Sequence, residues 1–587
     1  MKLFFTLFIV VFTFQFSFGQ YYLRGQVFSD KGQTLSGVKI YLKSKGPIDF
    51  ATGDDGSFGI PTPKLVDTIT LMLDGYETYN APIPTKDFQK LTMKMRQGTA
   101  MEMQNRLVSI TKNLGVAKEA VIETGMGESY NNLYENNFVS AKENPETGFA
   151  LNIDRASYSH VRRFIYNKFN VPTEAVRIEQ MLNYFNLQPA STFEQQASKR
   201  FTSNSVITNC PWDNTNQLLF VNLQAPKLNL DSVPPSNLVF LIDVSGSMDQ
   251  ANRLPLLQAA FRLLVNNLRE QDKISIVTYG GGVRIALNPT SGSEKKKIME
   301  VIDALTANGD TPGSGAIRTA YFLAKSNFSK DFNNRVILAT DGDFNVGQRT
   351  DEELENLIVS ERQTGISLTC LGVGMGNFKD SKLETLSKQG NGNYAYLDNV
   401  NEAEKVLVTE FTKTLYNVAE EAYLNIVFNP TYVSKYRLIG FDNPRDIMAD
   451  TSNKIQGGEV GSGHSMMAMF EIKPTSNNLE GIQNQSFATL NLQYKLPKTR
   501  ELIKQSFGIP YAPKNLMSVD SVYRFATSIA MFGSILRGSK YMNGVGFESV
   551  MQMAQSAVNP NVFSQKEFLD IVDKADGIYN PRKKKKK

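Results

Sequence analysis

The sequence predicts a multidomain α/β plus β protein, in which a Rossmann-like, doubly wound domain is flanked by a small β-sandwich and an α+β C-terminal domain. Strand and helix patterns alternate over residues 236–416, which is typical of a parallel sheet covered on both faces. Residues 20–96 and 417–580 contain amphipathic strand patterns instead. The 587 residues exceed what one core fills, and 41% apolar with 21% charged residues is a globular balance.

Residues 1–19 are predicted to be a secretory signal peptide. Lys2 precedes an apolar run over Leu3–Phe18, and Ser17 and Gly19 are small residues at the cleavage positions. The run is shorter than the roughly 20 residues of a membrane-spanning helix, and no later segment is long and apolar enough. We therefore expect an exported, soluble protein in the periplasm, at the cell surface or secreted, with an uncleaved anchor as the alternative.

Residues 20–96 are predicted to form a small antiparallel sandwich. Short alternating runs such as VKIYLKSK and TITLMLDG are separated by turn residues, with Gly32, Gly53, Gly56 and Gly75 at the positions of hairpin turns. The order GQVFSDKGQTLSGVKIYL, TGDDGSFGI and LDGYETY resembles the carboxypeptidase regulatory-like module. That resemblance implies a non-catalytic β-sandwich.

Residues 97–130 have no clear period and are interpreted as a linker. In residues 131–235, apolar residues at helical spacing predict helices over Ala156–Phe169 and about 176–182. This segment is similar to the N-terminal region of one subgroup of bacterial von Willebrand factor A (VWA) proteins. Its DxxSY pattern consists of Asp154, Ser157 and Tyr158. The resemblance implies architecture but no activity.

Residues 236–416 contain six strand patterns, LVFLID, KISIVTY, VRIAL, RVILATD, ISLTCLGVG and NYAYL. Because VRIAL follows KISIVTY through only Gly280–Gly282, it is predicted to be an antiparallel edge strand. Cys370 lies inside an apolar strand pattern and is expected to be a buried free thiol. Export permits a disulfide between Cys210 and Cys370 but does not require one.

The segment NLVFLIDVSGSMD predicts a metal site. An apolar strand ends at Asp243, and Ser245 and Ser247 follow, offering the hard oxygen ligands that suit Mg²⁺, Mn²⁺ or Ca²⁺ rather than zinc. Thr311 lies in the loop GDTPGSG, and Asp341 follows the strand RVILAT. In a doubly wound sheet, the carboxyl ends of neighbouring strands face one crevice, so these five side chains are expected to converge.

This motif order resembles the metal-ion-dependent adhesion site of VWA domains, over about 180 residues. The resemblance implies that Ser245 and Ser247 ligate directly, that Thr311 ligates when a partner binds, and that Asp243 and Asp341 bind directly or through water. It also implies an open position for an acidic side chain of a protein or peptide ligand. Mg²⁺ is the ion we expect, with Ca²⁺ and Mn²⁺ as alternatives, and a metal-free VWA fold is the opposing hypothesis.

Three further aspartates adjoin the motif. Asp310 stands where a small residue is usual, which could favour Ca²⁺ or weaken an acidic partner. Asp249 and Asp343 are expected further from the ion or on the surface.

Residues 417–580 contain amphipathic strands and then helices, from about residue 519 to 557, and resemble the C-terminal domain that accompanies the same VWA subgroup. The segment GGEVGSGHSMMAMFEI, with His464, matches its glycine-rich strand pair. The tail at 581–587 carries six positive charges of a net formal charge of +5. The rest of the mature chain is therefore nearly neutral, which argues against a nucleic-acid partner. The tail is expected to be solvated, with anionic lipid or envelope polymer as an alternative contact.

No catalytic site or organic cofactor site is predicted. The two histidines, His160 and His464, form no HExxH motif, and His160 is expected to be a surface or packing residue. The sequence lacks a GxSxG elbow and a P-loop, and GVGMGN lacks the last glycine of a dinucleotide fingerprint. We expect an exported, non-enzymatic binding or scaffold protein. The alternative is an envelope structural protein in which the metal only stabilises domain packing.

Overall fold

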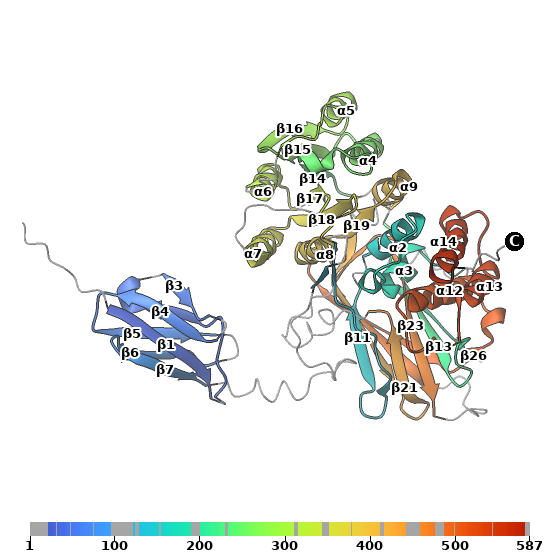
Figure 1. Cartoon of the computed structure of the whole chain (residues 1–587), viewed down its shortest axis with the longest axis horizontal. Helices are drawn as coiled ribbons and strands as arrows, with labels where there is room; N and C mark the ends of the chain where they lie inside the picture. Colours follow the sequence, from blue (N-terminus) through green and yellow to red (C-terminus); the bar gives the residue numbers. More distant parts are fainter. Residues whose placement is uncertain are drawn as a thin grey trace, which may run out of the picture. The chain divides into compact units, whose positions relative to one another are not determined.

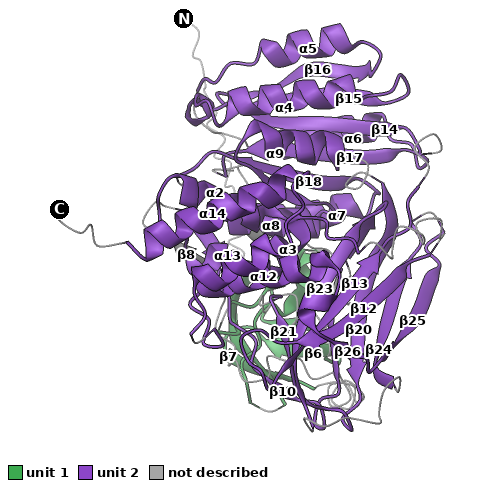
Figure 2. Cartoon of the chain, turned by 90° about the vertical axis from the view of Figure 1, so that its right-hand side faces the viewer, with its two compact units in different colours: residues 1–106 green, residues 107–587 purple. Residues whose placement is uncertain are grey.

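The computed structural model describes residues 21–581 except 31, 47, 54, 74–75, 95–120, 124–127, 152–153, 190–199, 229–232, 310–314, 343–350, 377, 411–415, 442–457, 476–485, 498 and 543. The chain forms two compact units, residues 1–106 and 107–587 (Figures 1 and 2). The predicted signal peptide and all but the first residue of the predicted tail lie outside the described residues. Among the helices that are described, none is long and apolar enough to cross a membrane.

The first unit is a β-sandwich. Its described strands are β1 (Tyr21–Ser29), β2 (Lys39–Leu42), β3 (Asp49–Ala51), β4 (Ser57–Thr62), β5 (Val66–Met72), β6 (Tyr79–Pro84) and β7 (Phe88–Met93). They form two sheets, ordered β4-β1-β7 and β3-β2-β5-β6, around a shared apolar core. β1 and β7 pair in parallel, so the prediction of a wholly antiparallel sandwich was wrong at this pair. Gly32 and Gly56 have φ of +78° and +77°, the left-handed conformation that glycine adopts in turns.

The second unit contains an α/β domain, residues 236–409, with the predicted six strands. These are β14 (Ser236–Asp243), β15 (Lys273–Tyr279), β16 (Val283–Ser291), β17 (Asn333–Thr340), β18 (Ser367–Val373) and β19 (Tyr394–Leu397). Its helices are α4 (Leu254–Asn266), α5 (Lys295–Asp303), α6 (Ala316–Ser326), α7 (Asp351–Arg362), α8 (Asp380–Gln389) and α9 (Val400–Glu404), followed by the π-helical turn η6 (Lys405–Thr409).

The sheet order is β16-β15-β14-β17-β18-β19, and β16 is the antiparallel edge strand. The central strand β14 is buried on both faces because its residues alternate between two cores. Leu238, Phe240 and Ile242 pack with residues of α4 and α5. Val239 and Leu241 pack with residues of α6 and α8. Its neighbours β15 and β17 lie on opposite sides, so the chain order reverses at β14, which is where doubly wound sheets place a ligand crevice.

The rest of the second unit is one composite domain built from the segments on both sides of the α/β domain. The preceding segment supplies β8 (Val121–Glu123), β9 (Ser129–Asn131), β10 (Val139–Ser140), β11 (Glu146–Ala150), α2 (Ala156–Tyr166), α3 (Ile178–Tyr184), β12 (Thr202–Asn209) and β13 (Gln217–Gln224). The following segment supplies β20 (Asn417–Phe428), β21 (Val433–Ile439), β22 (Gly458–Gly461), β23 (Ser465–Pro474), β24 (Ser486–Lys495), β25 (Leu502–Pro510), β26 (Pro513–Lys514), α12 (Ser521–Leu536), α13 (Phe547–Gln555) and α14 (Phe563–Tyr579).

Both large sheets of the composite domain mix strands from the two segments. One sheet has the order β10-β21-β23-β13-β12-β26, and the other has β11-β20-β24-β25 with β22 also paired to β20. The sequence prediction treated residues 131–235 and 417–580 as separate domains. They instead share sheets, and the α/β domain is inserted between them in the chain.

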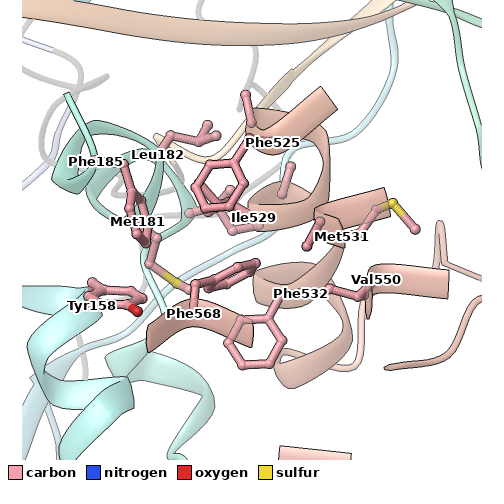
Figure 3. Packing of buried hydrophobic residues seen from close by; sticks show 14 of the residues in the cluster. Tyr158, Met181, Leu182, Phe185, Phe525, Ile529, Met531, Phe532, Val550 and Phe568 are labelled. Atoms are coloured by element: carbon pink, nitrogen blue, oxygen red, sulfur yellow. The ribbon is translucent and has the colours of Figure 1, made fainter. Parts of the chain in front are cut away.

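The composite domain has three layers. One apolar core fills the space between the two sheets. A second core lies between the first sheet and the helices α2, α3, α12, α13 and α14. Phe568 is at its centre, with the rings of Phe185, Phe525 and Phe532 at 5.4–5.8 Å (Figure 3). Rings at these separations and steep angles pack edge to face, a favourable arrangement for aromatic pairs.

A buried polar interface joins the composite domain to the α/β domain. His160 on α2 and Arg177, just before α3, contact the two carboxylate oxygens of Asp380 on α8, at 2.9 and 2.6 Å. His160 is fully buried, so it is a packing residue rather than a surface residue. The residues 128–131, predicted as the end of a linker and the start of a new domain, belong to this interface: Ser129 N–H donates to the Phe378 carbonyl at 2.9 Å. Cys210 and Cys370 are both buried and free.

Candidate metal centre

Three loops meet beyond the carboxyl ends of β14 and β15. The backbone fastens them together: Val244 N–H donates to the Tyr279 carbonyl at 2.7 Å, and Asn308 N–H donates to the Val244 carbonyl at 2.7 Å. Gly246 N–H donates to the Gly309 carbonyl at 2.9 Å. These bonds hold the turn after β14 against the loop that leads to residue 311.

Glycines allow this close approach. Gly280 has φ +138°, and a Cβ there would lie 2.5 Å from the Ser245 nitrogen. Gly309 has φ +85°, and a Cβ there would lie 2.6 Å from the Gly281 Cα. Any side chain at these two positions would push the loops apart, so the sequence requires glycine there for steric reasons.

Asp243 is fully buried at the end of β14 and makes hydrogen bonds with both carboxylate oxygens. Its Oδ1 accepts from Ser245 N–H at 2.9 Å. Its Oδ2 accepts from the Tyr279 hydroxyl at 3.0 Å and the Thr340 hydroxyl at 3.1 Å. Burial raises the pKa of Asp243, and the nearby charge of Asp341 adds to the increase. Because these hydrogen bonds fix its position, the Asp243 carboxylate could bind an ion either directly or through a water molecule.

Ser245 and Ser247 present two hydroxyls to the same side of the turn. Their Oγ atoms lie 3.1 Å apart. Two adjacent ligands of an octahedral Mg²⁺, each bound at about 2.0–2.1 Å, are separated by about 3.0 Å. The hydroxyl pair therefore fits neighbouring positions around such an ion. Ser245 is buried, whereas Ser247 and Gly246 are exposed, so this position opens to solvent.

Asp341 follows β17 and pairs with Arg253, the residue just before α4. The Arg253 guanidinium donates to Asp341 Oδ2 at 2.8 Å, to the Ser247 carbonyl at 2.6 Å and to the Met375 carbonyl at 2.9 Å. Sequence reasoning missed Arg253, Tyr279 and Thr340. Tyr279 and Thr340 each end a strand next to β14, which was a usable signal, whereas nothing in the sequence indicated Arg253.

The structure thus brings four of the five predicted metal ligands to the same edge of the sheet, at or just beyond the carboxyl ends of β14 and β17. Asp243, Ser245, Ser247 and Asp341 are described there, and Thr311 lies outside the described residues, as do Asp310 and Asp343. Asp249 is exposed. Within the described ranges no group of three or more His, Cys, Asp or Glu gathers as a metal site. The arrangement instead combines hydroxyls with two carboxylates, a hard-oxygen donor set that suits Mg²⁺, Mn²⁺ or Ca²⁺.

Three family models match the chain in succession. The model described as von Willebrand factor matches residues 124–220, and the von Willebrand factor type A domain matches residues 237–409. The model described as the C-terminal part of the uncharacterized protein YfbK matches residues 413–578. The candidate metal centre therefore lies inside the segment that the type A domain model matches, and the two other models match the segments of the composite domain before and after it.

Among similar proteins is the uncharacterized protein YfbK of Escherichia coli K12, which is 35% identical over 471 residues, covering 76% of this chain and 81% of that protein. The inter-alpha-trypsin inhibitor heavy chain H2 of Mesocricetus auratus is 30% identical over 181 residues, covering 30% of this chain but only 19% of that protein. A solved von Willebrand factor type A structure from Catenulispora acidiphila has 14% identity and a TM-score of 0.38, covering 64% of this chain and 90% of that one.

Proposed function

Because the chain belongs to the YfbK family of VWA-domain proteins, we propose that it is an exported, non-enzymatic binding protein whose VWA domain holds a protein or peptide ligand through a divalent metal ion. VWA-domain proteins usually mediate protein interactions, and VWA domains commonly bind a divalent metal at the metal-ion-dependent adhesion site. The proposal assigns this general role to the metal centre of this chain.

One observation carries the proposal. The Ser245 and Ser247 hydroxyl oxygens lie 3.1 Å apart at the edge of the sheet, where Ser247 is exposed. Asp243 is fully buried, Asp341 is nearly so, and the two carboxylates are close enough for the charge of Asp341 to raise the pKa of Asp243. An ion held there would have its charge balanced from the protein side by carboxylates, while its outer side faces solvent. Such an ion can accept a carboxylate from a partner.

Mg²⁺ is the proposed ion, with Ca²⁺ and Mn²⁺ as alternatives. Ser245 and Ser247 would bind it directly, Thr311 would join when a ligand is engaged, and Asp243 and Asp341 would act directly or through water. The ion would supply a positive point that recognises an acidic side chain. The loops that carry these side chains are joined by backbone hydrogen bonds, so the ligands would hold the ion at a fixed position.

Two further parts of the proposal concern the N-terminal region. The apolar run over residues 3–18 supports export by a signal peptide, to the periplasm or cell surface. The two-sheet sandwich of the first unit supports a carboxypeptidase regulatory-like module at the front of the mature protein. This module and the composite domain would serve as scaffolds for the VWA domain.

A capture experiment tests the binding role. Purified full-length protein and its Asp243→Ala variant are immobilised and exposed to envelope extract in Mg²⁺, in Ca²⁺ or in EDTA. We expect the wild-type protein to retain a partner in Mg²⁺. The same partner should be absent when EDTA is present, and absent from the Asp243→Ala variant in every buffer. An unchanged set of retained proteins under all conditions would contradict the proposal.

The alternative function, an envelope structural protein in which the ion only stabilises packing, makes a different prediction. In that case EDTA lowers the melting temperature of the wild-type protein, yet every captured partner stays bound. A fall in melting temperature in EDTA shows that the ion was bound and removed, and retention or loss of the partners on the same samples then separates the two functions.

A further inference from the structure

We propose that Arg253 is a positioning residue that couples occupancy of the metal centre to the contact between the VWA domain and the composite domain. The inference rests on the proposed function, because it assumes that an ion binds beside Asp341. It concerns a loop that both domains hold, Gly374–Gly376, which follows β18 and is called the interdomain loop below.

On the metal side, the interdomain loop is held by Arg253. The guanidinium joins Asp341 Oδ2 at 2.8 Å and the Met375 carbonyl at 2.9 Å, and the Arg253 side chain is 8% exposed. Gly374 has φ +79°, and a Cβ there would lie 2.5 Å from Arg253 Nε. The guanidinium therefore lies directly against the backbone of the loop, with no space for a side chain between them.

On the other side, the same loop is held by the composite domain. Gly376 N–H donates to Glu128 Oε1 at 3.0 Å, and Arg163 donates to the Gly374 carbonyl at 3.3 Å. Glu128 is fully buried and accepts two further bonds from Arg163, at 2.8 and 2.7 Å. Within the VWA domain, the Tyr396 hydroxyl from β19 donates to the same Gly374 carbonyl. These contacts form a continuous chain from a predicted metal ligand to the composite domain.

The shape of the Arg253 side chain explains why this series of contacts can transmit an effect of metal binding to the composite domain. Its planar group donates in fixed directions and so links Asp341, the Ser247 carbonyl and the Met375 carbonyl as one rigid fork. An ion that fixes the Asp341 carboxylate also fixes the group that this carboxylate holds. We therefore infer that metal binding steadies the interdomain loop and its bonds to Glu128. Lysine keeps the charge but cannot make this fork.

The coupling must also work in reverse, because linkage between two sites is reciprocal. If metal binding strengthens the contact between the domains by a given factor, that contact strengthens metal binding by the same factor. Couplings of this kind are typically about 5–150-fold.

Hydrogen exchange on the full-length chain tests the inference. The amides to follow are Gly376 and Ser129, which bond across the two domains. We expect Mn²⁺ to slow their exchange at least about fivefold in the wild-type protein. In Arg253→Lys the effect should fall below about twofold, although the variant still binds Mn²⁺. Arg262→Lys is the matched control on α4, since Arg262 is half exposed and pairs with the half-exposed Asp303 on the surface; it should behave as wild type.

A second variant guards against a folding defect in Arg253→Lys. Tyr396→Phe removes one bond to the interdomain loop and leaves the Arg253 contacts intact, and it should weaken the Mn²⁺ effect in the same direction. The inference is overturned if Arg253→Lys retains the full Mn²⁺ effect, or if Mn²⁺ binds the wild-type protein without slowing either amide. Mn²⁺ binding is measured in parallel by electron paramagnetic resonance. A wild-type protein that binds no Mn²⁺ would overturn the proposed metal site itself, a result distinct from bound metal without coupling.

Discussion

Replacing Glu128 by glutamine is expected to destabilise the second unit strongly. Glu128 is fully buried and receives bonds from Arg163 at 2.8 and 2.7 Å, from the Tyr130 hydroxyl at 2.8 Å and from Gly376 N–H at 3.0 Å. Glutamine has nearly the same volume but no charge, and its NH₂ group cannot accept a bond from the guanidinium. Glu128→Gln therefore leaves the buried charge of Arg163 without its counter-ion.

The expected magnitude follows from burial. Removing one member of a buried ion pair typically costs about 3–5 kcal/mol, because the remaining charge stays desolvated. Exposed ion pairs contribute only about 0–1 kcal/mol. Since Glu128 is fully buried and Arg163 nearly so, the free energy of unfolding should fall by about 3–5 kcal/mol. Glu128→Gln/Arg163→Met should lose less than the sum of the two single changes.

The pH dependence has a definite sign. Burial raises the pKa of Glu128, but the Arg163 guanidinium and the backbone bond from Gly376 lower it more, so the net pKa lies below its usual value. A carboxyl with a lowered folded pKa stabilises the fold above its unfolded pKa of about 4.3 and loses that contribution as the pH falls through the folded pKa. The difference between wild type and Glu128→Gln should therefore shrink below about pH 4.

Urea unfolding measures these effects. Trp212 is the single tryptophan and packs beside the helical core, so its fluorescence reports on the composite domain. Glu300→Gln is the matched control, because Glu300 is 66% exposed and its ion-pair distance to Lys296 is 4.0 Å; it should change stability by no more than about 0.5 kcal/mol. The reasoning fails if Glu128→Gln costs less than about 1 kcal/mol, or if the double variant is simply additive.

Three other predictions follow from the fold and the site. Phe568→Ala empties the centre of the helical core and should cost about 3–5 kcal/mol in urea unfolding, whereas Phe563→Ala, on the same helix and 65% exposed, should be close to neutral. Burial raises the pKa of Glu459 to about 8, so the folded state holds its proton more tightly and stability falls as pH rises from about 4.5 to 8; a glutamine at this position should flatten that part of the stability profile. Gly280→Ala places a Cβ 2.5 Å from the Ser245 nitrogen and should weaken Mn²⁺ binding measured by electron paramagnetic resonance.

Each of these predictions has a contradicting result. Equal losses for the two phenylalanine variants would show that the helical core is not packed as described. A pH profile that is the same for wild type and Glu459→Gln would mean that the proton is not held by this residue. Unchanged Mn²⁺ affinity in Gly280→Ala would show that the turn after β14 tolerates displacement.

The α/β domain was predictable from the sequence because its signals are local. β14 contains the unbroken apolar run Leu238–Ile242, and the three-residue connection between β15 and β16, Gly280–Gly282, allows only a hairpin. The short connection identified the antiparallel edge strand. The serines and aspartates of the candidate metal centre were likewise indicated by their places at or just after the ends of β14 and β17, which the sheet brings to one edge.

The composite domain was not predictable in the same way, because its pairing is not local. Val221 on β13 pairs with Ala468 on β23, nearly 250 positions away, and neither strand's alternation identifies its neighbour. The segment at Glu128 contains no periodic pattern, so it was interpreted as linker, although its side chain is fully buried. Arg253 was missed for a related reason: its three acceptors come from three separate loops, and only folding brings them together.

The central claim is that Ser245, Ser247 and the two nearby aspartates hold a divalent ion, and direct titration with Mn²⁺ tests it. Electron paramagnetic resonance on the full-length protein measures free Mn²⁺ for the wild type, for Ser247→Ala and for Ser293→Ala, an exposed serine away from the site. Residues that only support a ligand commonly change affinity about 10–100-fold, so loss of a direct ligand should cost at least about tenfold. We predict one site in the wild type and in Ser293→Ala, and at least that loss in Ser247→Ala. Equal binding by all three proteins, or by none of them, would contradict the account.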